Sequence, residues 1–342
     1  MKVICVEAHA SDAGLLEASI PAMEAECPYA ANLGENIESD TPDPNTRPRI
    51  LSPEVTEELV ARPIPERISE MDRHGIDLQV VSYSDMFQYA PLPIGVELIA
   101  KANDRLADIV RKHPNRLAGF SALPWQDPDA ALRELDRTVG DLGLRATLLS
   151  GRPGKAFLDD PVYKPILARL EQLRVPLSLH PGYPDKTVQK IYYQGFEKQA
   201  EALFSIYGWG WHNESGIQVL RLILSGTLDR YPDLRIISGH WGEMVPFFLQ
   251  RLDDSMPRSV TGLSRSITQT YVDQIYVTPS GMLDQSQFKY IHEVVGPDRI
   301  MYSGDYPYLT LDGTRRFLEG LPVSEAERVM IASGNAERLL LA

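Results

Sequence analysis

The feature that most constrains the fold is a regular alternation of short apolar runs with amphipathic stretches along most of the chain. The apolar runs are rich in β-branched residues, which is typical of strands buried on both faces. Strands that alternate with helices imply right-handed crossovers and a parallel sheet. The runs predicted to be strands are residues 2–6, 78–82, 117–122, 144–149, 175–179, 234–238, 275–278 and 300–303.

Eight such units predict a closed (β/α)8 barrel, the TIM barrel of the α/β class. An open doubly wound sheet is the alternative, but no Gly-x-Gly-x-x-Gly follows the first run. The length of 342 residues fits one barrel, because such domains routinely exceed about 200 residues. We therefore predict a single domain over residues 1–342.

Two stretches do not fit this repeat. Residues 11–65 are rich in Pro, Asn, Asp and Glu and have poor periodicity, so we predict a long irregular insertion between the first strand and the first helix. Residues 181–213 carry many aromatic side chains. They favour a pocket wall or a subunit contact, although simple packing over the barrel mouth explains them equally well.

The composition excludes several classes of partner. A formal net charge of -13 disfavours nucleic acid, because phosphate binding needs clustered Lys and Arg. No apolar run approaches the roughly 18 residues of a membrane span. The two cysteines, Cys5 and Cys27, lack the spacing of redox motifs and favour a reducing compartment. We therefore predict a cytoplasmic protein, away from membranes, whose partner is a small-molecule substrate.

Ionisable side chains follow several predicted strands, at the point where each strand ends. Glu7 and His9 come after the first strand, and because side chains alternate along a strand they leave from the same side. His180 follows the fifth strand, and Asp305 follows the eighth. The carboxyl ends of barrel strands gather on one face, where barrel active sites lie. Together these residues offer nitrogen and oxygen donors for one divalent ion, with space left for water or substrate.

His240 follows the sixth predicted strand, and Glu243 lies where the next helix is expected to begin. The glutamate could hold one nitrogen of His240 and fix its tautomer for acid–base work. It could also complement the helix N-terminus, and the two roles are compatible. Among the remaining histidines, His74, His113 and His292 are interpreted as structural, and His212 stays open.

Longer motifs surround these positions: Ala122-Leu-Pro-Trp-Gln-Asp-Pro-Asp129, Leu179-His-Pro181, Gly239-His-Trp-Gly-Glu243 and Met301-Tyr-Ser-Gly-Asp-Tyr-Pro307. With the Glu-x-His at the first strand, they resemble the amidohydrolase superfamily over nearly the whole chain. Within it, the chain is similar to the branch of γ-resorcylate and 2,3-dihydroxybenzoate decarboxylases, to which aminocarboxymuconate-semialdehyde decarboxylase is related. A glutamate in place of the usual first histidine is typical of the phenolic-acid decarboxylases.

The resemblance implies a catalytic pair, His240 with Glu243, near the substrate. It also implies a single divalent metal, because no lysine ends the fourth predicted strand, where binuclear relatives carry one. Zinc is the expected ion, with manganese or magnesium as alternatives, and no organic cofactor is expected. The implied metal ligands are Glu7, His9, His180 and Asp305.

Two further residues are implied as substrate-binding. Arg251 matches an arginine that in relatives reaches toward the active site of the neighbouring subunit, which implies a homodimer or a dimer of dimers. Ser150 stands with Gly151 where relatives often carry Asn-Gly. Trp241 likewise replaces a methionine that is common in relatives, so the resemblance leaves the identity of the substrate open.

The implied activity is non-oxidative decarboxylation of a small hydroxylated aromatic acid. The metal would bind the carboxylate and an ortho hydroxyl, and Asp305 would protonate the ring carbon that bears the carboxylate. His240, oriented by Glu243, would stabilise the charge that develops. The alternative is metal-dependent hydrolysis of an ester, lactone or amide at the same site, with His240 or Asp305 as the base.

Overall fold

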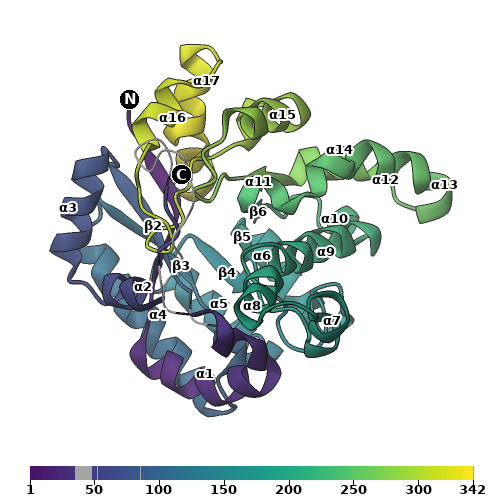
Figure 1. Cartoon of the computed structure of the whole chain (residues 1–342). Coiled ribbons are helices and arrows are strands. Elements are labelled where there is room, and N and C mark those ends of the chain that lie inside the picture. The colour runs from purple at the N-terminus through teal and green to yellow at the C-terminus, as the bar shows by residue number, and fades with distance from the viewer. Residues whose placement is uncertain (35–47, 52, 85, 342) are drawn as a thin grey trace.

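A computed structural model of the protein describes residues 1–34, 48–51, 53–84 and 86–341. Its centre is one sheet of seven parallel strands that pair in chain order. Figure 1 shows the helices arranged around the outside of this sheet, the arrangement of an α/β barrel. The strands are β1 (Ile4–Ala10), β2 (Leu78–Tyr83), β3 (Leu117–Ser121), β4 (Ala146–Ser150), β5 (Leu177–His180), β6 (Ile236–Ser238) and β7 (Ile275–Val277).

The eighth predicted strand, residues 300–303, is not a regular strand, and this part of the prediction is wrong. Residues 300–303 make one isolated parallel bridge, from Ile300 to β7, and a second bridge joins Tyr306 to β1. The segment still fills the gap between these strands, since Met301 N donates to a β7 carbonyl at 3.1 Å and Tyr302 O accepts from a β1 amide at 3.0 Å. Beyond it the chain leaves the extended conformation at Asp305, where φ is 57°.

The inside of the barrel changes from apolar to polar along the strands. Alternate residues of each strand face inward, and at the amino ends they form one apolar cluster with Ala336 and Leu340 of the C-terminal segment. Toward the carboxyl ends the inward positions carry Ser82, Ser150 and His180. The apolar inward residues are Ile4, Val6, Leu78, Val80, Ala118, Phe120, Ala146, Leu148, Ile237, Tyr276 and Met301.

The helices bury one face each against the outer side of the sheet, as Ile99, Ala102 and Leu106 of α4 do. Among the described residues, no helix combines the length and the apolar character that crossing a bilayer requires. The helices are α1 (Ala13–Glu26), α2 (Pro53–Val60), α3 (Ile64–His74), α4 (Ile94–Lys112), α5 (Pro128–Gly140), α6 (Lys164–Leu173), α7 (Lys186–Tyr192), α8 (Lys198–Ser205), α9 (Gly210–Leu224), α10 (Thr227–Arg230), α12 (Leu249–Ser255), α13 (Arg258–Thr261), α14 (Ile267–Gln274), α15 (Gln285–Val295), α16 (Thr314–Glu319) and α17 (Glu325–Val329).

The stretch after β1 is more regular than predicted. It contains α1 and α2, so the prediction of an irregular insertion over residues 11–65 is wrong for these parts; residues 35–47 lie outside the described residues. The sequence pattern of α1 is weak because only Leu15 and Ser19 of its side chains are buried. Its start is fixed by Asp12, whose side chain accepts a hydrogen bond from Leu15 N at 3.1 Å.

The aromatic stretch 181–213 is also largely helical, with α7, α8 and the start of α9. The ring centroid of Trp211 lies 6.0 Å from that of His180 at the end of β5. The ring centroids of Tyr183 and Trp211 lie 6.4 Å apart. Tyr29 of η1 (Pro28–Asn32) packs on Tyr183, also with 6.4 Å between the ring centroids. These contacts place the aromatic side chains next to His180 at the barrel mouth, which is compatible both with simple packing and with a pocket wall.

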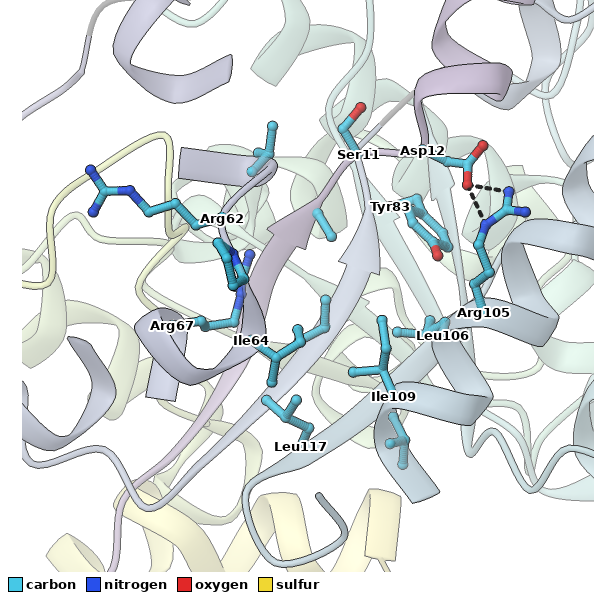
Figure 2. A pocket seen from close by; sticks show the side chains of 15 residues that line it. Ser11, Asp12, Arg62, Ile64, Arg67, Tyr83, Arg105, Leu106, Ile109 and Leu117 are labelled. Atoms are coloured by element: carbon cyan, nitrogen blue, oxygen red, sulfur yellow. Dashed lines mark hydrogen bonds and ion pairs between the residues drawn. The ribbon is translucent and has the colours of Figure 1, made fainter. Parts of the chain in front are cut away.

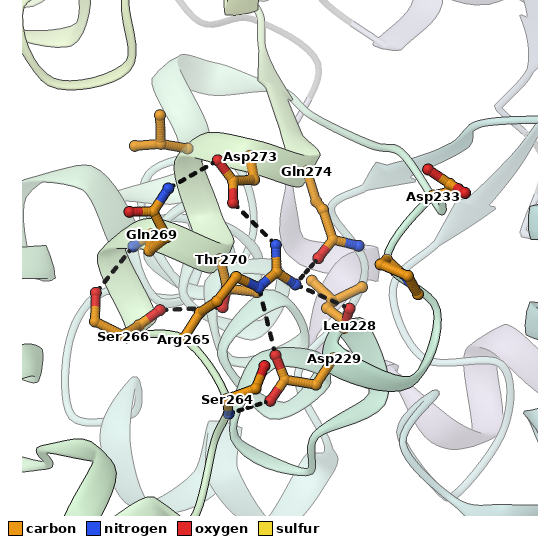
Figure 3. A network of polar contacts seen from close by, with 12 residues as sticks. Leu228, Asp229, Asp233, Ser264, Arg265, Ser266, Gln269, Thr270, Asp273 and Gln274 are labelled. Atoms are coloured by element: carbon orange, nitrogen blue, oxygen red, sulfur yellow. Dashed lines mark hydrogen bonds and ion pairs between the residues drawn. The ribbon is translucent and has the colours of Figure 1, made fainter.

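Away from the barrel mouth, a polar network centred on Arg265 connects α10 and α14 (Figure 3). Arg265 meets two carboxylates, Asp229 at 3.5 Å and Asp273 at 3.0 Å. It also donates to Gln274 Oε1 at 2.6 Å and to Leu228 O at 3.2 Å. One cation and its acceptors thus tie the loop before α14 to both helices. We call these five residues the Arg265 network.

Candidate active site

The structure brings together the four residues predicted to be metal ligands. One donor atom from each of Glu7, His9, His180 and Asp305 lies within 4.8 Å of the others. His9 Nε2 is 3.1 Å from Asp305 Oδ1 and 3.9 Å from Glu7 Oε1. His9, His180 and Asp305 are buried, and Glu7 is nearly so. These residues form one compact set, which we call the donor cluster.

Irregular backbone brings these side chains to one point. The register of β1 against β2 shifts within β1, after which His9 lies opposite Ser82; such a bulge re-aims the side chains that follow it. On the far side of β1, the amide of Asp305 donates to Glu7 O at 3.2 Å. The φ of 57° at Asp305 is left-handed, a conformation that is uncommon outside glycine and clusters at active sites.

Two atoms of the donor cluster make no hydrogen bond. His9 Nε2 and Asp305 Oδ1 are buried and lie 3.1 Å apart, but among the described residues neither atom makes a hydrogen bond of good geometry. Other atoms are held in place: His180 Nδ1 donates to the next backbone carbonyl at 2.9 Å, and Ser280 donates to Glu7 Oε2. Within the described residues, no lysine or arginine pairs with either carboxylate. Because unpartnered buried polar atoms are unfavourable, the donor cluster fits a divalent cation.

The carboxylates of the donor cluster also shift the pKa of its histidines. Burial disfavours the His9 cation, but the adjacent carboxylates of Asp305 and Glu7 prevail and raise the pKa of His9 to about 9. Burial and the charge on His9 lower the pKa of His180 to about 4. The two carboxylates thus draw one positive charge to this point. A bound divalent cation would take the place of that proton.

A second cluster stands beside the first and is centred on Glu243. Its Oε1 accepts a hydrogen bond from His240 Nδ1 at 2.8 Å, and its Oε2 accepts one from His212 Nδ1 at 2.8 Å. Burial opposes ionisation of this carboxyl, but the charges of His240 and His212 hold the pKa of Glu243 below its ordinary value. Glu243 is therefore a buried anion shared by two imidazoles. We call these three residues the Glu243 cluster.

The chain forms the Glu243 cluster through an unusual turn, α11 (His240–Glu243), in which every residue has a positive φ between 46° and 81°. A side chain at Gly242 would collide with the hydroxyl of Tyr271, so glycine is required there. The predicted start of a helix at Glu243 is wrong, because this left-handed turn separates it from the next regular helix, which begins at Leu249. The expected hydrogen bond between Glu243 and His240 is present.

His240 and Ser280 join the two clusters. His240 Nε2 lies 3.9 Å from Asp305 Oδ2. Ser280 accepts from His240 N at 3.0 Å and donates to Glu7, so one hydroxyl contacts both clusters. Burial disfavours the His240 cation, but the charge of Glu243 and the nearby carboxylate of Asp305 raise the pKa of His240 well above its ordinary value. His240 therefore carries a proton next to the donor cluster.

The two residues predicted to bind substrate differ in their burial and in their position relative to the two clusters. Ser150 is buried at the end of β4, in register with His180 of β5. Its hydroxyl has no hydrogen-bond partner among the described residues, and it belongs to the polar inward layer that leads to the donor cluster. Arg251 is exposed on α12, and within the described parts of the chain no hydrogen bond or ion pair joins it to either cluster.

Sequence reasoning left His212 open and missed two other residues of this region, Ser280 and Arg67. His212 follows no strand and lies in the first turn of α9. Ser280 follows β7, a strand end at which the sequence places no ionisable group, and its position there was the available signal. Arg67 of α3 is buried and donates to His9 O and, at 3.3 Å, to Gln79 Oε1. A basic residue within an amphipathic helix gives no signal of such a contact.

A separate cavity of about 250 Å³ lies on the outer side of β1 and β2, between α3 and α4. Figure 2 shows apolar side chains of both helices around it, with Arg62 and Arg67 on one side and the ion pair of Arg105 with Asp12 on the other. None of the donor cluster residues lines it. Arg67 lines this cavity and also reaches the backbone of His9, so the two regions share one side chain.

A parallel α/β barrel with imidazole and carboxylate donors at the carboxyl ends of its strands defines a class, the metal-binding barrel proteins. The Amidohydrolase family model (Amidohydro_2) matches residues 43–341 of the chain. The chain therefore belongs to the amidohydrolase family, and the resemblance inferred from the strand-end motifs is confirmed.

Named relatives cover most of the barrel. The chain is similar to Decarboxylase orsB of Emericella nidulans, with 34% identity over 282 residues, 80% of this chain and 84% of that protein. It is similar to Gamma-resorcylate decarboxylase of Polaromonas sp., with 34% identity over 286 residues, 80% of this chain and 86% of that protein. A solved dihydroxybenzoic acid decarboxylase from Polaromonas sp., with bound manganese and the inhibitor 2-nitroresorcinol, matches at 29% identity and a TM-score of 0.82, covering 99% of this chain and 96% of that chain.

Proposed function

We propose that this protein is a metal-dependent decarboxylase that releases carbon dioxide from a small ortho-hydroxylated aromatic acid. The observation that carries the proposal is the buried donor cluster, in which His9 Nε2 and Asp305 Oδ1 make no hydrogen bond among the described residues, next to the proton-bearing His240. Support comes from the similarity, over most of the chain, to gamma-resorcylate decarboxylase. The whole chain, residues 1–342, would act as a single domain.

The donor cluster would hold one divalent ion. Glu7, His9, His180 and Asp305 provide two carboxylates and two imidazoles, a mixed set that zinc, manganese and magnesium all accept. The sequence favoured zinc, whereas the solved relative holds manganese, so reconstitution should compare the two. When bound, such an ion supplies Lewis-acid polarisation of the oxygens of the substrate.

Asp305 and His240 would carry out the proton transfer that decarboxylation requires. The reaction replaces a carboxylate by hydrogen: a proton joins the ring carbon, and the electron pair of the broken C–C bond returns to the ring as carbon dioxide leaves. Asp305 delivers that proton. During the reaction the Nε2–H of His240 donates to the phenolic oxygen as charge develops. Between turnovers His240, whose Nε2 lies 3.9 Å from Asp305 Oδ2, passes a proton to Asp305 and regains one from solvent. The ring itself accepts the electrons, so no organic cofactor takes part.

The inward layer and the aromatic stretch would form the pocket for the ring. Ser150 has a buried hydroxyl without a partner among the described residues, one strand away from His180, so it can bond a polar substituent of the acid. Trp211 packs beside His180 and offers an apolar face to an aromatic ring. Substitution of Ser150 should therefore change the preference among substituted benzoates more than it changes kcat for the best one.

We also propose a homodimer or a dimer of dimers, in which Arg251 reaches the substrate site of the neighbouring subunit. Next to α12, the segment η4 (Val245–Phe248) exposes large apolar side chains: Phe248 is 58% exposed and Phe247 is 47% exposed. Phe247 also stacks on Tyr290 of α15, with 4.6 Å between the ring centroids. Exposed apolar patches of this kind mark interaction surfaces. Light scattering of a Phe248→Asp variant should show a lower mass than the parent protein.

We also propose that the protein is located in the cytoplasm. Both cysteines are free and buried, as expected for a protein that folds under reducing conditions.

Carbon dioxide release tests the proposed activity. Metal-reconstituted protein should be assayed with 2,6- and 2,3-dihydroxybenzoate, salicylate and 5-carboxyvanillate, with unsubstituted benzoate as the control that lacks the ortho hydroxyl. We expect equal amounts of carbon dioxide and phenol from at least one hydroxylated acid, and none after chelation. If metal-loaded protein releases no carbon dioxide from any of these acids but hydrolyses an ester or lactone, the result would support the hydrolase alternative instead.

A further inference from the structure

We infer that His212 is a positioning residue of the active site: it holds Glu243 so that Glu243 in turn holds His240 toward the donor cluster. The inference deepens the proposed function and rests on it for the kinetic readout, but its spectroscopic readout depends on geometry alone. His212 follows no strand, and it reaches the site from the first turn of α9, which packs over the barrel mouth.

The two oxygens of Glu243 are divided between two rings. Oε1 pairs with His240 Nδ1 and Oε2 pairs with His212 Nδ1, both at 2.8 Å. The ring centroids of His212 and His240 lie 4.4 Å apart, and the Glu243 side chain has no exposed surface. Without His212, Oε2 would be a buried charged atom without its donor, which is strongly unfavourable. The carboxylate would then turn, and both of its oxygens would compete for the one remaining N–H of His240.

The contacts on the other side of His212 are compatible with a proton on Nδ1 whether the ring is neutral or charged. His212 Nε2 lies 3.0 Å from Tyr207 O and 3.2 Å from Trp211 Nε1. The carbonyl can only accept and the indole can only donate. A neutral ring with its proton on Nδ1 accepts from Trp211, and a charged ring donates to Tyr207 O. In both states Nδ1–H points at Glu243, whereas the remaining tautomer would place a lone pair against the buried carboxylate.

The orientation of His240 matters because of what lies beyond it. His240 Nε2 is 3.9 Å from Asp305 Oδ2, and we propose that the proton moves between these groups. Reacting groups must be held within a fraction of an ångström, since a shift of about 1 Å lowers rates roughly 100-fold. A residue that fixes Glu243 therefore acts on the reaction through His240, without touching the substrate.

The Glu243 cluster also has the donor types of a metal site. Two features favour hydrogen bonding instead. Each N···O contact has the length of a charge-assisted hydrogen bond, and each carboxylate oxygen has a single imidazole partner. The inference therefore predicts that removing His212 leaves the metal content per chain unchanged.

The experiment compares three variants of the metal-loaded enzyme. In His212→Asn, the amide nitrogen stands the same number of bonds from the backbone as Nδ1 and can still donate to Glu243. In His212→Gln, the amide nitrogen corresponds to Nε2 and lies on the wrong side, and His212→Ala removes the donor altogether. His292→Ala, a partly exposed histidine on α15, is the matched control.

We expect kcat to fall roughly 10- to 100-fold in the Ala and Gln variants, with KM and metal content little changed, and to recover within a few-fold in the Asn variant. In parallel, nitrogen-15 NMR of labelled histidine should show the Nδ1–H of His240 bonded to a carboxylate in the parent and Asn variant, and weakened in the Ala and Gln variants. If His212→Ala does not fold, the Asn and Gln pair still makes the comparison.

Equal kcat in the parent, Ala and Gln variants would overturn the inference, as would loss of one metal ion per chain in His212→Ala. An Asn variant no better than the Gln variant would overturn it too, because that result indicates a packing role. If the parent protein releases no carbon dioxide from any acid, the proposed function fails; the NMR signal of His240 then still decides whether His212 positions Glu243.

Discussion

Two polar regions of this protein contain carboxylates of similar burial but balance their charge differently. In the Arg265 network, Asp229 is 16% exposed and pairs with the guanidinium of Arg265, which also meets Asp273 (Figure 3). In the donor cluster, Glu7 is 12% exposed and, among the described residues, its only charged partner is an imidazole. The first region contains a permanent cation, whereas the cations that the second region can supply are imidazoles, which are charged only when protonated.

This difference separates a structural role from a functional one. A network whose carboxylates are balanced by a guanidinium of its own, as Asp229 and Asp273 are by Arg265, stabilises the arrangement of the helices that carry it. A buried cluster that leaves His9 Nε2 and Asp305 Oδ1 without partners is unfavourable by itself. Such a cluster is tolerated where a ligand completes it. Loss of metal or mutation in the donor cluster should therefore lower the activity, whereas mutation in the Arg265 network should lower the stability and leave the activity unchanged.

Removal of the metal should have the largest effect. Chelation is expected to abolish carbon dioxide release and to lower the melting temperature, since an ion present at 100 times its Kd stabilises the folded state by about 2.7 kcal/mol. Activity assays and calorimetry before and after re-addition of manganese or zinc would check both expectations. Full activity in metal-free protein would remove the basis for treating the donor cluster as a metal site.

Replacement of Asp305 by Asn should come next. The variant keeps an oxygen that can bind the ion but cannot deliver a proton, so kcat should fall roughly 1000-fold. Metal content should drop only in part, as measured by elemental analysis. The exposed Asp141→Asn serves as the control, and normal turnover in Asp305→Asn would exclude this carboxylate as the proton donor.

Much of the donor cluster could be predicted from sequence because it depends on strand ends. Glu7, His9, His180 and Asp305 follow apolar runs, and the geometry of a parallel barrel brings such ends to one face whatever the helices do. The register shift in β1 was not needed to see that these residues converge, although it sets their final spacing. Local pattern and global topology therefore pointed to the same residues.

The other parts of the site and of the fold depend on contacts and backbone conformations that a sequence pattern does not encode. His212 meets Glu243 because α9 packs over the barrel mouth and presents its first turn to a segment 31 residues away. The eighth strand was predicted from an apolar run, but this segment pairs with its neighbours through isolated bridges and not through a regular ladder. The left-handed turn at His240 was missed because its residues adopt a conformation that most side chains avoid.

A smaller effect is expected at Ser280, which contacts both clusters. In Ser280→Ala, Glu7 loses the hydroxyl that donates to its Oε2, so metal should bind roughly 10- to 100-fold more weakly. Most of the activity should return at saturating metal. Metal titration of the variant beside the exposed control Ser259→Ala would measure this, and an unchanged Kd would show that Ser280 does not orient Glu7.

The smallest effect on activity is expected in the Arg265 network. Arg265→Met removes the cation between Asp229 and Asp273 together with its hydrogen bonds to Gln274 and Leu228. Hydrogen bonds to charged groups are worth a few kcal/mol, so we expect the free energy of unfolding to drop by about 2 kcal/mol. Because this network lies away from both clusters, kcat should stay within twofold. Denaturant unfolding would measure the change in stability and steady-state kinetics the change in kcat, with the exposed Arg133→Met as the control.

An Arg265→Met variant that kept its stability but lost its activity would contradict the comparison between the two regions. The Arg265 network would then serve the reaction and not the stability of the fold.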